Sequence, residues 1–525
     1  MLSSTLFRLI LDVGRLHTCI TILALAFVFL IGVSVVPAAG FQRSGDIRQL
    51  IKRSDKHLRN GNLSEAEKLL REALASSPNE PTTRLKLAFI AIKQRRFLEA
   101  YETALEIAKS DPSNAYAFAV LGTTLLNAGR FQDARPIFYT ALKIDRGEAV
   151  AWAGLGMLEF YENNITRGVE SLRQAIYIKP LEPDYYFTFA QVATRAEKYR
   201  DAADAYHKFL EVSRVPDDDR RARIKGLIAF LRFLGYKSGL HITGGEPHAS
   251  VGFELRGDRP VIDLKVNDRV EPMKFVLDTG SGISVISEET AARLKIKTIA
   301  RGGHAKGVGG DGRFEIVYGF LDQIQIGDVK IRNVPVYIRK FYGEKQNVDG
   351  YIGLSLISKF LTTIDYGNLT FSLTKKETTN EPETAGDHSL PLRLTSSGFL
   401  SGEVQVEGIE APLNFIVDTG ASVSVISDDL ARLESIIPFA RIEKMRVIGS
   451  AGVTNNVSTF SLPKVSFGSH TRRSVAAIAL DLDMINETSG FEQSGILGGN
   501  FLKNYRLTFD FKNSRVIFVP IDRVP

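Results

Sequence analysis

The chain has 525 residues, of which 44% are hydrophobic and 24% charged, so it holds enough apolar side chains for several globular units. Its net charge of +6 comes from 66 basic and 60 acidic residues without a long basic block, which argues against nucleic-acid binding. The single cysteine, Cys19, excludes an intramolecular disulfide and a cysteine-built metal site, and no H-E-x-x-H or G-x-S-x-G motif indicates a zinc or serine hydrolase. We expect neither a metal nor a cofactor.

The N-terminus carries Arg8 and Arg15, then an 18-residue apolar run over residues 19–36, then the sequence PAAG. A cleaved export signal fits this pattern, because small side chains stand where a signal peptidase cuts. An uncleaved membrane anchor fits as well, because the run reaches the lower length limit for crossing a bilayer. We therefore expect residues 1–39 to be a signal peptide or a membrane anchor. Either way the rest of the chain is expected to be exported, and to be periplasmic or anchored facing the periplasmic or extracellular side.

Small residues then recur at a fixed interval of 34 positions in two registers. The first register holds Ala66, Ala100, Ala134, Gly168 and Ala202, and the second holds Ser54, Ala88, Gly122, Gly156 and Ala190. This is the period of tetratricopeptide repeats, in which small residues let the two helices of each repeat cross closely.

Over residues 46–235 the chain therefore resembles tetratricopeptide proteins. Five repeats fill residues 46–215, and apolar residues at helical spacing over 221–234 predict a terminal helix that covers the last repeat. Such arrays have no chemistry of their own and usually hold a peptide or protein in a concave groove. The resemblance implies a recruiting arm with a protein partner.

Two copies of one short motif follow, Asp278-Thr279-Gly280 and Asp418-Thr419-Gly420, 140 positions apart. The first lies in the run FVLDTGSGISVIS and the second in FIVDTGASVSVIS. Each triplet follows an apolar stretch typical of a β-strand, and its glycine permits a sharp turn. Two homologous lobes, residues 248–374 and 390–525, joined by a polar linker over 375–389, are the simplest account.

The paired triplets resemble the active-site loops of the aspartic proteases, in which each lobe supplies one loop. Downstream, the sequences YIG at 351–353 and ILG at 496–498 match the apolar segment that packs beneath each loop in that family. The resemblance covers residues 248–525. The chain is thus expected to be multidomain α plus β, with an α-helical tetratricopeptide solenoid followed by a bilobed all-β region of the acid protease fold.

The resemblance implies that Asp278 and Asp418 are the catalytic pair of an endopeptidase. Like charges held close together cannot both ionise cheaply, so the two carboxyls share a proton. One then acts as base on a water molecule while the other donates to the carbonyl of a peptide or protein substrate.

The residues beside the aspartates are expected to support this pair. The resemblance implies that Thr279 and Thr419 form hydrogen bonds that lock the two lobes together. It also implies that Gly280 and Gly420 allow the two backbones to approach closely. Ser281 can donate a hydrogen bond to Asp278, whereas Ala421 cannot do so for Asp418, so the pair should be asymmetric.

Residues 307–312 satisfy the pattern G-x-G-x-x-G, but they precede a strand and open no helix, which excludes a dinucleotide site. A hairpin tip fits better. We expect two glycine-rich flap tips, as in the retropepsin type of aspartic protease. The flap candidates are Gly307, Gly309 and Gly310 in the first lobe and Gly449 and Gly452 in the second.

A different class of function also fits the sequence: a non-catalytic peptide-binding or scaffold protein in which the array dominates and the lobes are silent. Retention of both Asp278 and Asp418 argues against it.

Overall fold

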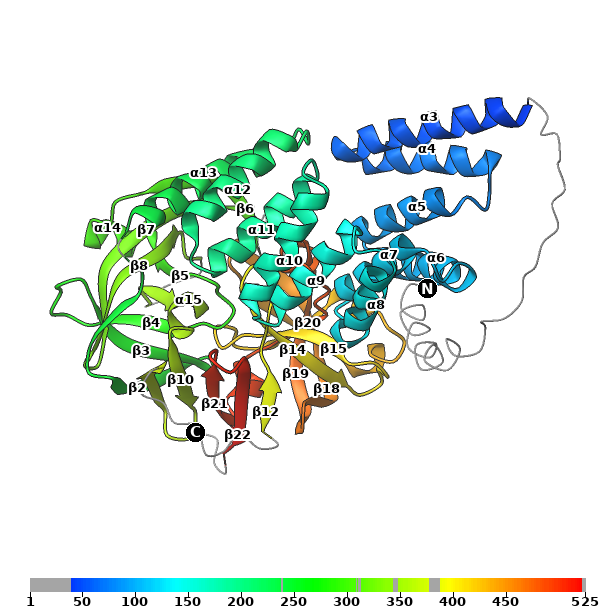
Figure 1. Ribbon diagram of the computed structural model, residues 1–525. Coiled ribbons are helices and arrows are strands. Elements are labelled where there is room, and N and C mark those ends of the chain that lie inside the picture. The colour runs from blue at the N-terminus through cyan, green and yellow to red at the C-terminus, as the bar shows by residue number, and fades with distance from the viewer. Residues whose placement is uncertain are drawn as a thin grey trace. The chain divides into compact units, whose positions relative to one another are not determined.

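The computed structural model of the protein describes residues 39–237, 239–307, 309, 313–342, 348–376 and 388–521 (Figure 1). Within these ranges, helices come first and two β-sheets follow, which confirms the predicted α plus β class. The expected signal or anchor at residues 1–38 and most of the expected linker, residues 377–387, lie outside the described part of the chain. No helix in the described ranges combines the length and the hydropathy that a membrane span requires.

The helical region is built from antiparallel pairs, followed by one longer helix. Its elements are α3 (Ala39–Arg59), α4 (Leu63–Ser76), α5 (Pro81–Lys93), α6 (Phe97–Ser110), α7 (Ala115–Asn127), α8 (Phe131–Ile144), α9 (Ala149–Tyr161), α10 (Ile165–Ile178), α11 (Pro183–Arg195), α12 (Tyr199–Val212) and α13 (Asp218–Tyr236).

Local sequence explains where these helices begin and how closely they pack. Glu80 caps α5 by accepting hydrogen bonds from the backbone of Thr82 and Thr83, and a proline occupies the first helical position. A Cβ atom added at Gly122 would lie 2.8 Å from the ring of Phe138 on the next helix. The small residue at this register position is therefore required by helix crossing, as the 34-residue period predicts.

The chain divides into two compact units. The first holds the described residues up to Leu158 together with 170–186 and 208–217. The second holds all of the strands, the turns that join α9 to α10 and α11 to α12, and helix α13. Part of the helical region thus belongs to the same unit as the sheets.

Strands of the second unit form two sheets. The first-lobe strands are β1 (Ile242–Gly245), β2 (His248–Arg256), β3 (Arg259–Val266), β4 (Met273–Leu277), β5 (Ser284–Ser287), β6 (Ala300–Lys306), β7 (Arg313–Ile326), β8 (Val329–Arg339), β9 (Gly350–Ile352), β10 (Phe360–Asp365) and β11 (Thr370–Lys375). The second-lobe strands are β12 (Ser389–Pro391), β13 (Arg393–Leu394), β14 (Leu400–Val406), β15 (Leu413–Val417), β16 (Ser424–Ser427), β17 (Ala440–Ile448), β18 (Val453–Phe467), β19 (His470–Leu480), β20 (Gly495–Leu497), β21 (Tyr505–Asp510) and β22 (Arg515–Pro520).

Short helices connect several of these strands. They are α14 (Glu288–Leu294), α15 (Leu354–Ile357), α16 (Asp428–Ala431), the 3₁₀ turn η3 (Ile437–Phe439), α17 (Asp483–Ser489) and α18 (Gly499–Leu502).

The two lobes have the same strand order. The first runs β3-β4-β9-β5-β8-β7-β6 and the second runs β14-β15-β20-β16-β19-β18-β17. In both, the strand before the triplet pairs in parallel with the short strand of the apolar-apolar-glycine segment, β4 with β9 and β15 with β20. The duplication read from the sequence is therefore a duplication of topology.

A further layer of the first sheet takes strands from both lobes, in the order β12-β22-β21-β10-β11-β2. At its centre β10 of the first lobe pairs antiparallel with β21 of the second, with Thr363 opposite Thr508. Phe360, Phe371, Phe509 and Phe518 from this layer are all fully buried. The lobes thus share one core, to which Phe275 and Phe415 from the strands before the two triplets also belong.

Helix α13 packs against the hairpin β6–β7 of the first lobe. The ring of Phe230 stacks on Tyr318 at 4.5 Å between centroids, and Phe233 meets Phe320 edge-on at 5.4 Å. A Cβ atom at Gly226 would lie 2.1 Å from the carbonyl oxygen of Arg301, so helix and strand backbones are in close contact. Helix α13 also contacts α12, where Nε of Arg200 donates to the carbonyl of Gly235. The helix is therefore a structural support of this hairpin as well.

Turns between the last helices of the array also contact the second lobe. The guanidinium of Arg195 lies over the ring of Phe160 and donates a hydrogen bond to the carbonyl of Thr395 at 2.6 Å. The hydroxyl of Tyr161 donates to the carbonyl of Gly490 at 3.2 Å. These contacts tie the end of the helical region to the sheets within the second unit.

Candidate active site

Asp278 and Asp418 each stand directly after the strand that leads to the triplet, β4 and β15. The backbone N–H of Asp278 donates to the carbonyl of Ile352 at 3.0 Å, and that of Asp418 donates to Leu497 at 3.0 Å. The apolar-apolar-glycine segments therefore fix both aspartates from below, at equivalent positions of the two lobes.

The two threonines cross between the lobes. The hydroxyl of Thr279 donates to the carbonyl of Val417 at 2.6 Å, and the hydroxyl of Thr419 donates to Leu277 at 2.7 Å. Each backbone N–H of the pair also donates to the hydroxyl of the other threonine, at 3.2 and 3.1 Å. Both side chains are fully buried, so this four-bond arrangement holds the two aspartate loops in register.

Gly280 and Gly420 lie where the two loops come closest. A Cβ atom at Gly280 would stand 2.4 Å from the carboxyl carbon of Asp418, and one at Gly420 would stand 2.5 Å from Oδ1 of Asp278. Any side chain at either position would displace the aspartate of the opposite lobe. Glycine is thus required here by close approach.

The carboxyls of Asp278 and Asp418 share a side-chain hydrogen bond, but their other partners differ. The N–H of Gly280 donates to Asp278 at 2.9 Å and that of Gly420 donates to Asp418 at 2.7 Å. The hydroxyl of Ser281 adds a hydrogen bond to Oδ2 of Asp278 at 2.6 Å. Ala421 stands at the equivalent place in the second lobe, and its methyl side chain has nothing to donate.

The surroundings hold the pKa of Asp418 well above its ordinary value. Removal from water is the main cause, followed by the negative charge of Asp278 and the hydrogen bond between the two carboxyls. Hydrogen bonds from the backbone of Gly420 and Ala421 act in the opposite direction. The net result is a neutral Asp418 at a pH where an isolated aspartate would be ionised.

Two hairpins, β6–β7 and β17–β18, carry the glycine-rich tips. A Cβ atom at Gly307 would lie 2.4 Å from the hydroxyl of Ser450, and one at Gly309 would lie 2.4 Å from the carbonyl oxygen of Gly452. The N–H of Gly449 donates to that same carbonyl and closes the second tip. Four of the flap candidates are therefore brought together, while Gly310 lies outside the described residues.

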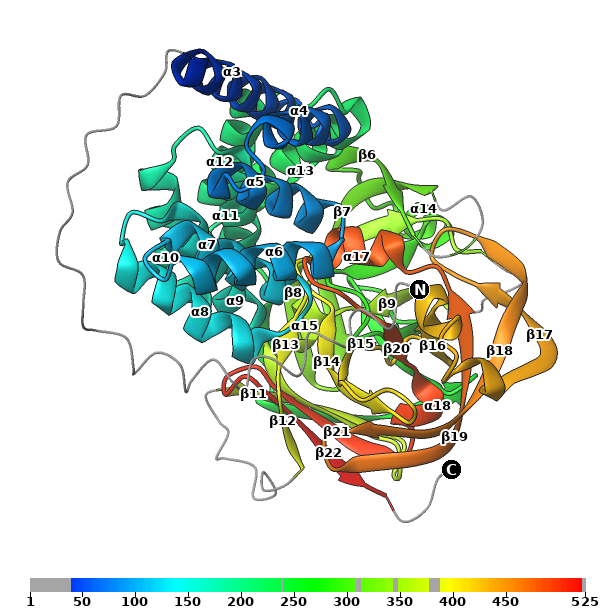
Figure 2. The same cartoon turned by 90° about the vertical axis from the view of Figure 1, so that its right-hand side faces the viewer.

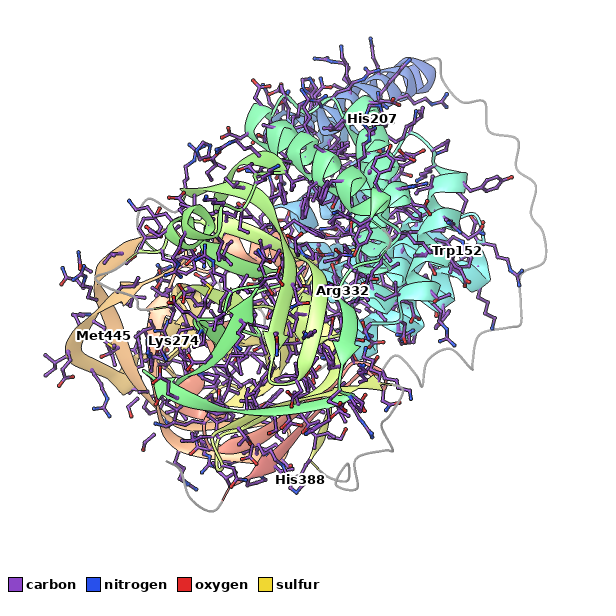
Figure 3. The ribbon with its side chains drawn as sticks, turned by 90° about the vertical axis from the view of Figure 1, so that its left-hand side faces the viewer. Trp152, His207, Lys274, Arg332, His388 and Met445 are labelled. Atoms are coloured by element: carbon purple, nitrogen blue, oxygen red, sulfur yellow. The ribbon has the colours of Figure 1, made fainter. Side chains whose placement is uncertain are left out.

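The hairpins differ in their support. Helix α13 covers β6, whereas β17 is exposed along nearly its whole length (Figure 2). Ile442 on β17 is 96% exposed, and Met445 lies at the outer edge of the hairpin (Figure 3). The two-fold symmetry of the lobes is thus broken at the flaps.

The sequence reasoning missed three residues that make contacts within or around the lobes. Arg339, at the end of β8, donates to the carbonyl of Ser450 in the second flap tip. Gly226 and Arg195 are among the residues through which the helical region contacts the lobes. Aligning the two lobes strand by strand exposes Arg339, because Leu480 ends the equivalent strand β19.

Within the ranges that the structure describes, no group of histidine, cysteine, aspartate and glutamate side chains is placed to hold a metal ion. The site chemistry available from these residues is that of a proton-sharing carboxyl pair.

Comparison with known proteins gives two family matches. Residues 262–356 and 402–501 match the model of the aspartyl protease family, and residues 57–122 match a tetratricopeptide repeat model. No curated protein sequence matches the chain.

Solved structures that resemble the chain include three helical repeat proteins. A thermophilic tetratricopeptide protein of Thermus thermophilus is 19% identical, with 35% of this chain and 98% of that chain covered and a TM-score of 0.30. MamA of Desulfovibrio magneticus is 21% identical, with 33% and 97% covered and a TM-score of 0.23. PilF of Pseudomonas aeruginosa is 18% identical, with 37% and 87% covered and a TM-score of 0.28.

Both matched segments of the protease model contain one of the Asp-Thr-Gly triplets, and the repeat model falls on the helices with the 34-residue period. The chain therefore joins an N-terminal array of tetratricopeptide repeats to a two-lobed region of the aspartyl protease family.

Proposed function

We propose that this protein is an exported aspartic endopeptidase in which Asp278 and Asp418 activate a water molecule. The observation that carries the proposal is the hydrogen-bonded pair of carboxyls, held in register by the crossed hydroxyls of Thr279 and Thr419. This geometry is costly for a purely structural role, because two acidic groups are held together away from water.

The asymmetry of the pair assigns its roles. Ser281 donates a hydrogen bond to Asp278 alone, while the raised pKa of Asp418 keeps the shared proton on Asp418. Asp278 then takes a proton from water as the water oxygen attacks the peptide carbonyl carbon. Asp418 donates its proton to the carbonyl oxygen, which gives a neutral tetrahedral intermediate.

Collapse of that intermediate completes the reaction. The proton held by Asp278 passes to the leaving nitrogen as the C–N bond breaks, and a hydroxyl proton of the intermediate returns to Asp418. The products are a free amine and a carboxylic acid, and the pair regains its starting protonation.

The helical array has two roles in this proposal. Its last turns and α13 brace the lobes, on the strength of the contacts of Arg195, Tyr161 and Phe230. The earlier repeats recruit a protein substrate or partner, as tetratricopeptide grooves do, and so raise the local concentration of substrate at the lobes.

The deciding experiment is incubation of the purified full chain with a denatured protein mixture over a range of pH, with and without a statine-type inhibitor. Inhibitor-sensitive cleavage supports the peptidase. Binding of peptides without cleavage at any pH supports instead the non-catalytic scaffold. Fractionation of producing cells tests export separately, since recovery of the chain in the cytoplasm contradicts that part of the proposal.

A further inference from the structure

Arg339 stands at the end of a first-lobe strand and contacts the tip of the second-lobe flap. It ends β8, which runs parallel to β5, the strand that follows the Asp278 loop, with Arg339 opposite Ser287. Its Nη1 donates to the carbonyl of Ser450, in the turn of the second-lobe hairpin, at 3.0 Å. The guanidinium therefore spans from the wall of one lobe to the flap of the other.

Aromatic rings surround this guanidinium. Its carbon lies 5.6 Å from the ring centre of Phe314, 5.8 Å from that of Phe341 and 6.0 Å from that of Tyr351. Phe314 belongs to the first flap, and Tyr351 to the segment beneath the Asp278 loop. The faces of these rings attract the guanidinium and surround it with apolar side chains.

Arg339 is also electrostatically linked to the catalytic pair. Burial lowers the pKa of its guanidinium, while the carboxyl of Asp278 and the phenol of Tyr351 act in the opposite direction. Its Nε is buried and donates to no acceptor in the described part of the chain. A buried guanidinium donor without a partner is a costly arrangement that an added acceptor would relieve, and a carboxylate can accept two parallel N–H bonds from arginine.

The second lobe provides an internal comparison. Its equivalent strand β19 runs parallel to β16 and ends at Leu480, opposite Ser427. Leu480 packs in an apolar cluster with Ile478, Ile496 and the nearby Ala421. The strand end that carries the cationic Arg339 in the first lobe thus carries the apolar Leu480 in the second.

We propose that Arg339 is a specificity-determining residue that makes the site select peptides with an acidic side chain beside the scissile bond on the first-lobe side, and an apolar one on the other side. This inference rests on the proposed peptidase function. A substrate carboxylate would take the free donor of Arg339, and the bond to Ser450 would orient the guanidinium toward it.

Cleavage of matched peptides tests the selection. A sequence cleaved by the full chain would be synthesised with glutamate or glutamine at each position flanking the cut. At one flanking position we expect kcat/KM to be at least tenfold higher for the glutamate peptide than for the glutamine peptide. At the position on the other side of the scissile bond we expect no such preference. Arg339→Met should reduce that ratio to about one, while Arg332→Met, which removes an exposed arginine of the same strand (Figure 3), should leave it unchanged.

Binding separates this inference from the peptidase proposal. The same peptides, labelled with a fluorophore, would be titrated against the full chain carrying Asp418→Asn, with and without Arg339→Met. A glutamate preference in binding that depends on Arg339 supports the inference even if no cleavage is found. Equal binding and equal cleavage of both peptides, or a preference that survives Arg339→Met, would overturn it.

Discussion

Thr279 and Thr419 exchange hydrogen bonds so that each hydroxyl donates to the strand that carries the other's aspartate. Each hydroxyl also accepts the backbone N–H of the other threonine. Two side chains whose hydroxyls donate to backbone carbonyls and not to the carboxyls therefore help to set the geometry of the aspartate pair.

Replacing Thr419 by valine keeps the side-chain shape but removes one donor and one acceptor from a fully buried network. The carbonyl of Leu277 and the N–H of Thr279 lose their partners, and each unsatisfied group costs about 1–3 kcal/mol. We expect urea unfolding to show that the free energy of unfolding falls by an amount in that range or above it. Thr298→Val, on an exposed side chain of the first lobe, should change stability by less than about 0.5 kcal/mol.

Asp278→Asn and Asp418→Asn should each abolish peptide cleavage, because either change removes the shared proton with almost no change in volume. Circular dichroism should show an intact fold in both. Residual kcat/KM above about one hundredth of the wild-type value, a barrier change under about 2.7 kcal/mol, would contradict a two-aspartate mechanism.

The raised pKa of Asp418 makes stability depend on pH in a defined direction. Folding favours its neutral form, so this contribution is complete below the ordinary aspartate range and is lost as pH rises through the raised value. The amide introduced by Asp418→Asn is neutral at every pH. The Asp418→Asn chain should thus match the wild type in melting temperature below about pH 4 and exceed it at neutral pH.

The control for this measurement is Asp429→Asn, which changes an aspartate whose side chain is 83% exposed in the same lobe. The melting temperature of the Asp429→Asn chain should differ from that of the wild type by the same amount at every pH. A melting temperature of Asp418→Asn that falls below the wild type at neutral pH would mean that Asp418 is ionised in the folded chain.

Ser281→Ala removes the hydroxyl that donates to Asp278. Because this hydrogen bond reaches only one of the two carboxyls, its loss should change the pH profile of kcat/KM and lower the peak severalfold. The reverse change, Ala421→Ser, offers a donor to Asp418 and should reduce the difference between the carboxyls. Identical pH profiles for all three chains would exclude this hydroxyl as the source of asymmetry.

Phe230→Ala should destabilise the unit that contains the lobes. Phe230 is 1% exposed and stacks on Tyr318 of the first flap hairpin, and a buried phenylalanine replaced by alanine costs about 3–5 kcal/mol. Arg232→Ala, on the exposed side of the same helix, should cost less than about 0.5 kcal/mol. Equal effects of the two changes in denaturant unfolding would show that α13 contributes nothing to the hairpin.

Much of this architecture can be predicted from the sequence because it is repeated there. The small residues at 34-residue intervals predict the helix pairs, since a crossing such as Gly122 against Phe138 tolerates nothing larger. The two triplets predict the carboxyl pair because both lobes use the same strand and loop. Even the difference between Ser281 and Ala421 can be predicted, because each residue directly follows its Asp-Thr-Gly triplet.

Contacts that occur once in the fold could not be predicted in this way. The apolar face of α13 has helical spacing whether it meets another helix or a sheet, so Phe230 gives no indication of Tyr318. Arg339 lies 61 residues after Asp278 and reaches Ser450 only through the folding of both lobes. Arg339 stands out only when the strands of the two lobes are superimposed and Leu480 is found at the equivalent position. No local sequence motif indicates this equivalence.

The shared layer β12-β22-β21-β10-β11-β2 also sets the order of events during synthesis. Strand β10 remains without its neighbour β21 until residues 505–510 have been made. Helix α13 likewise leaves the ribosome before the hairpin that covers Phe230 and Phe233. The nascent chain therefore exposes unpaired strand edges and aromatic side chains until the second lobe has been made, and such surfaces favour aggregation. The aspartate pair likewise cannot assemble before the loop that carries Asp418 has been made and folded.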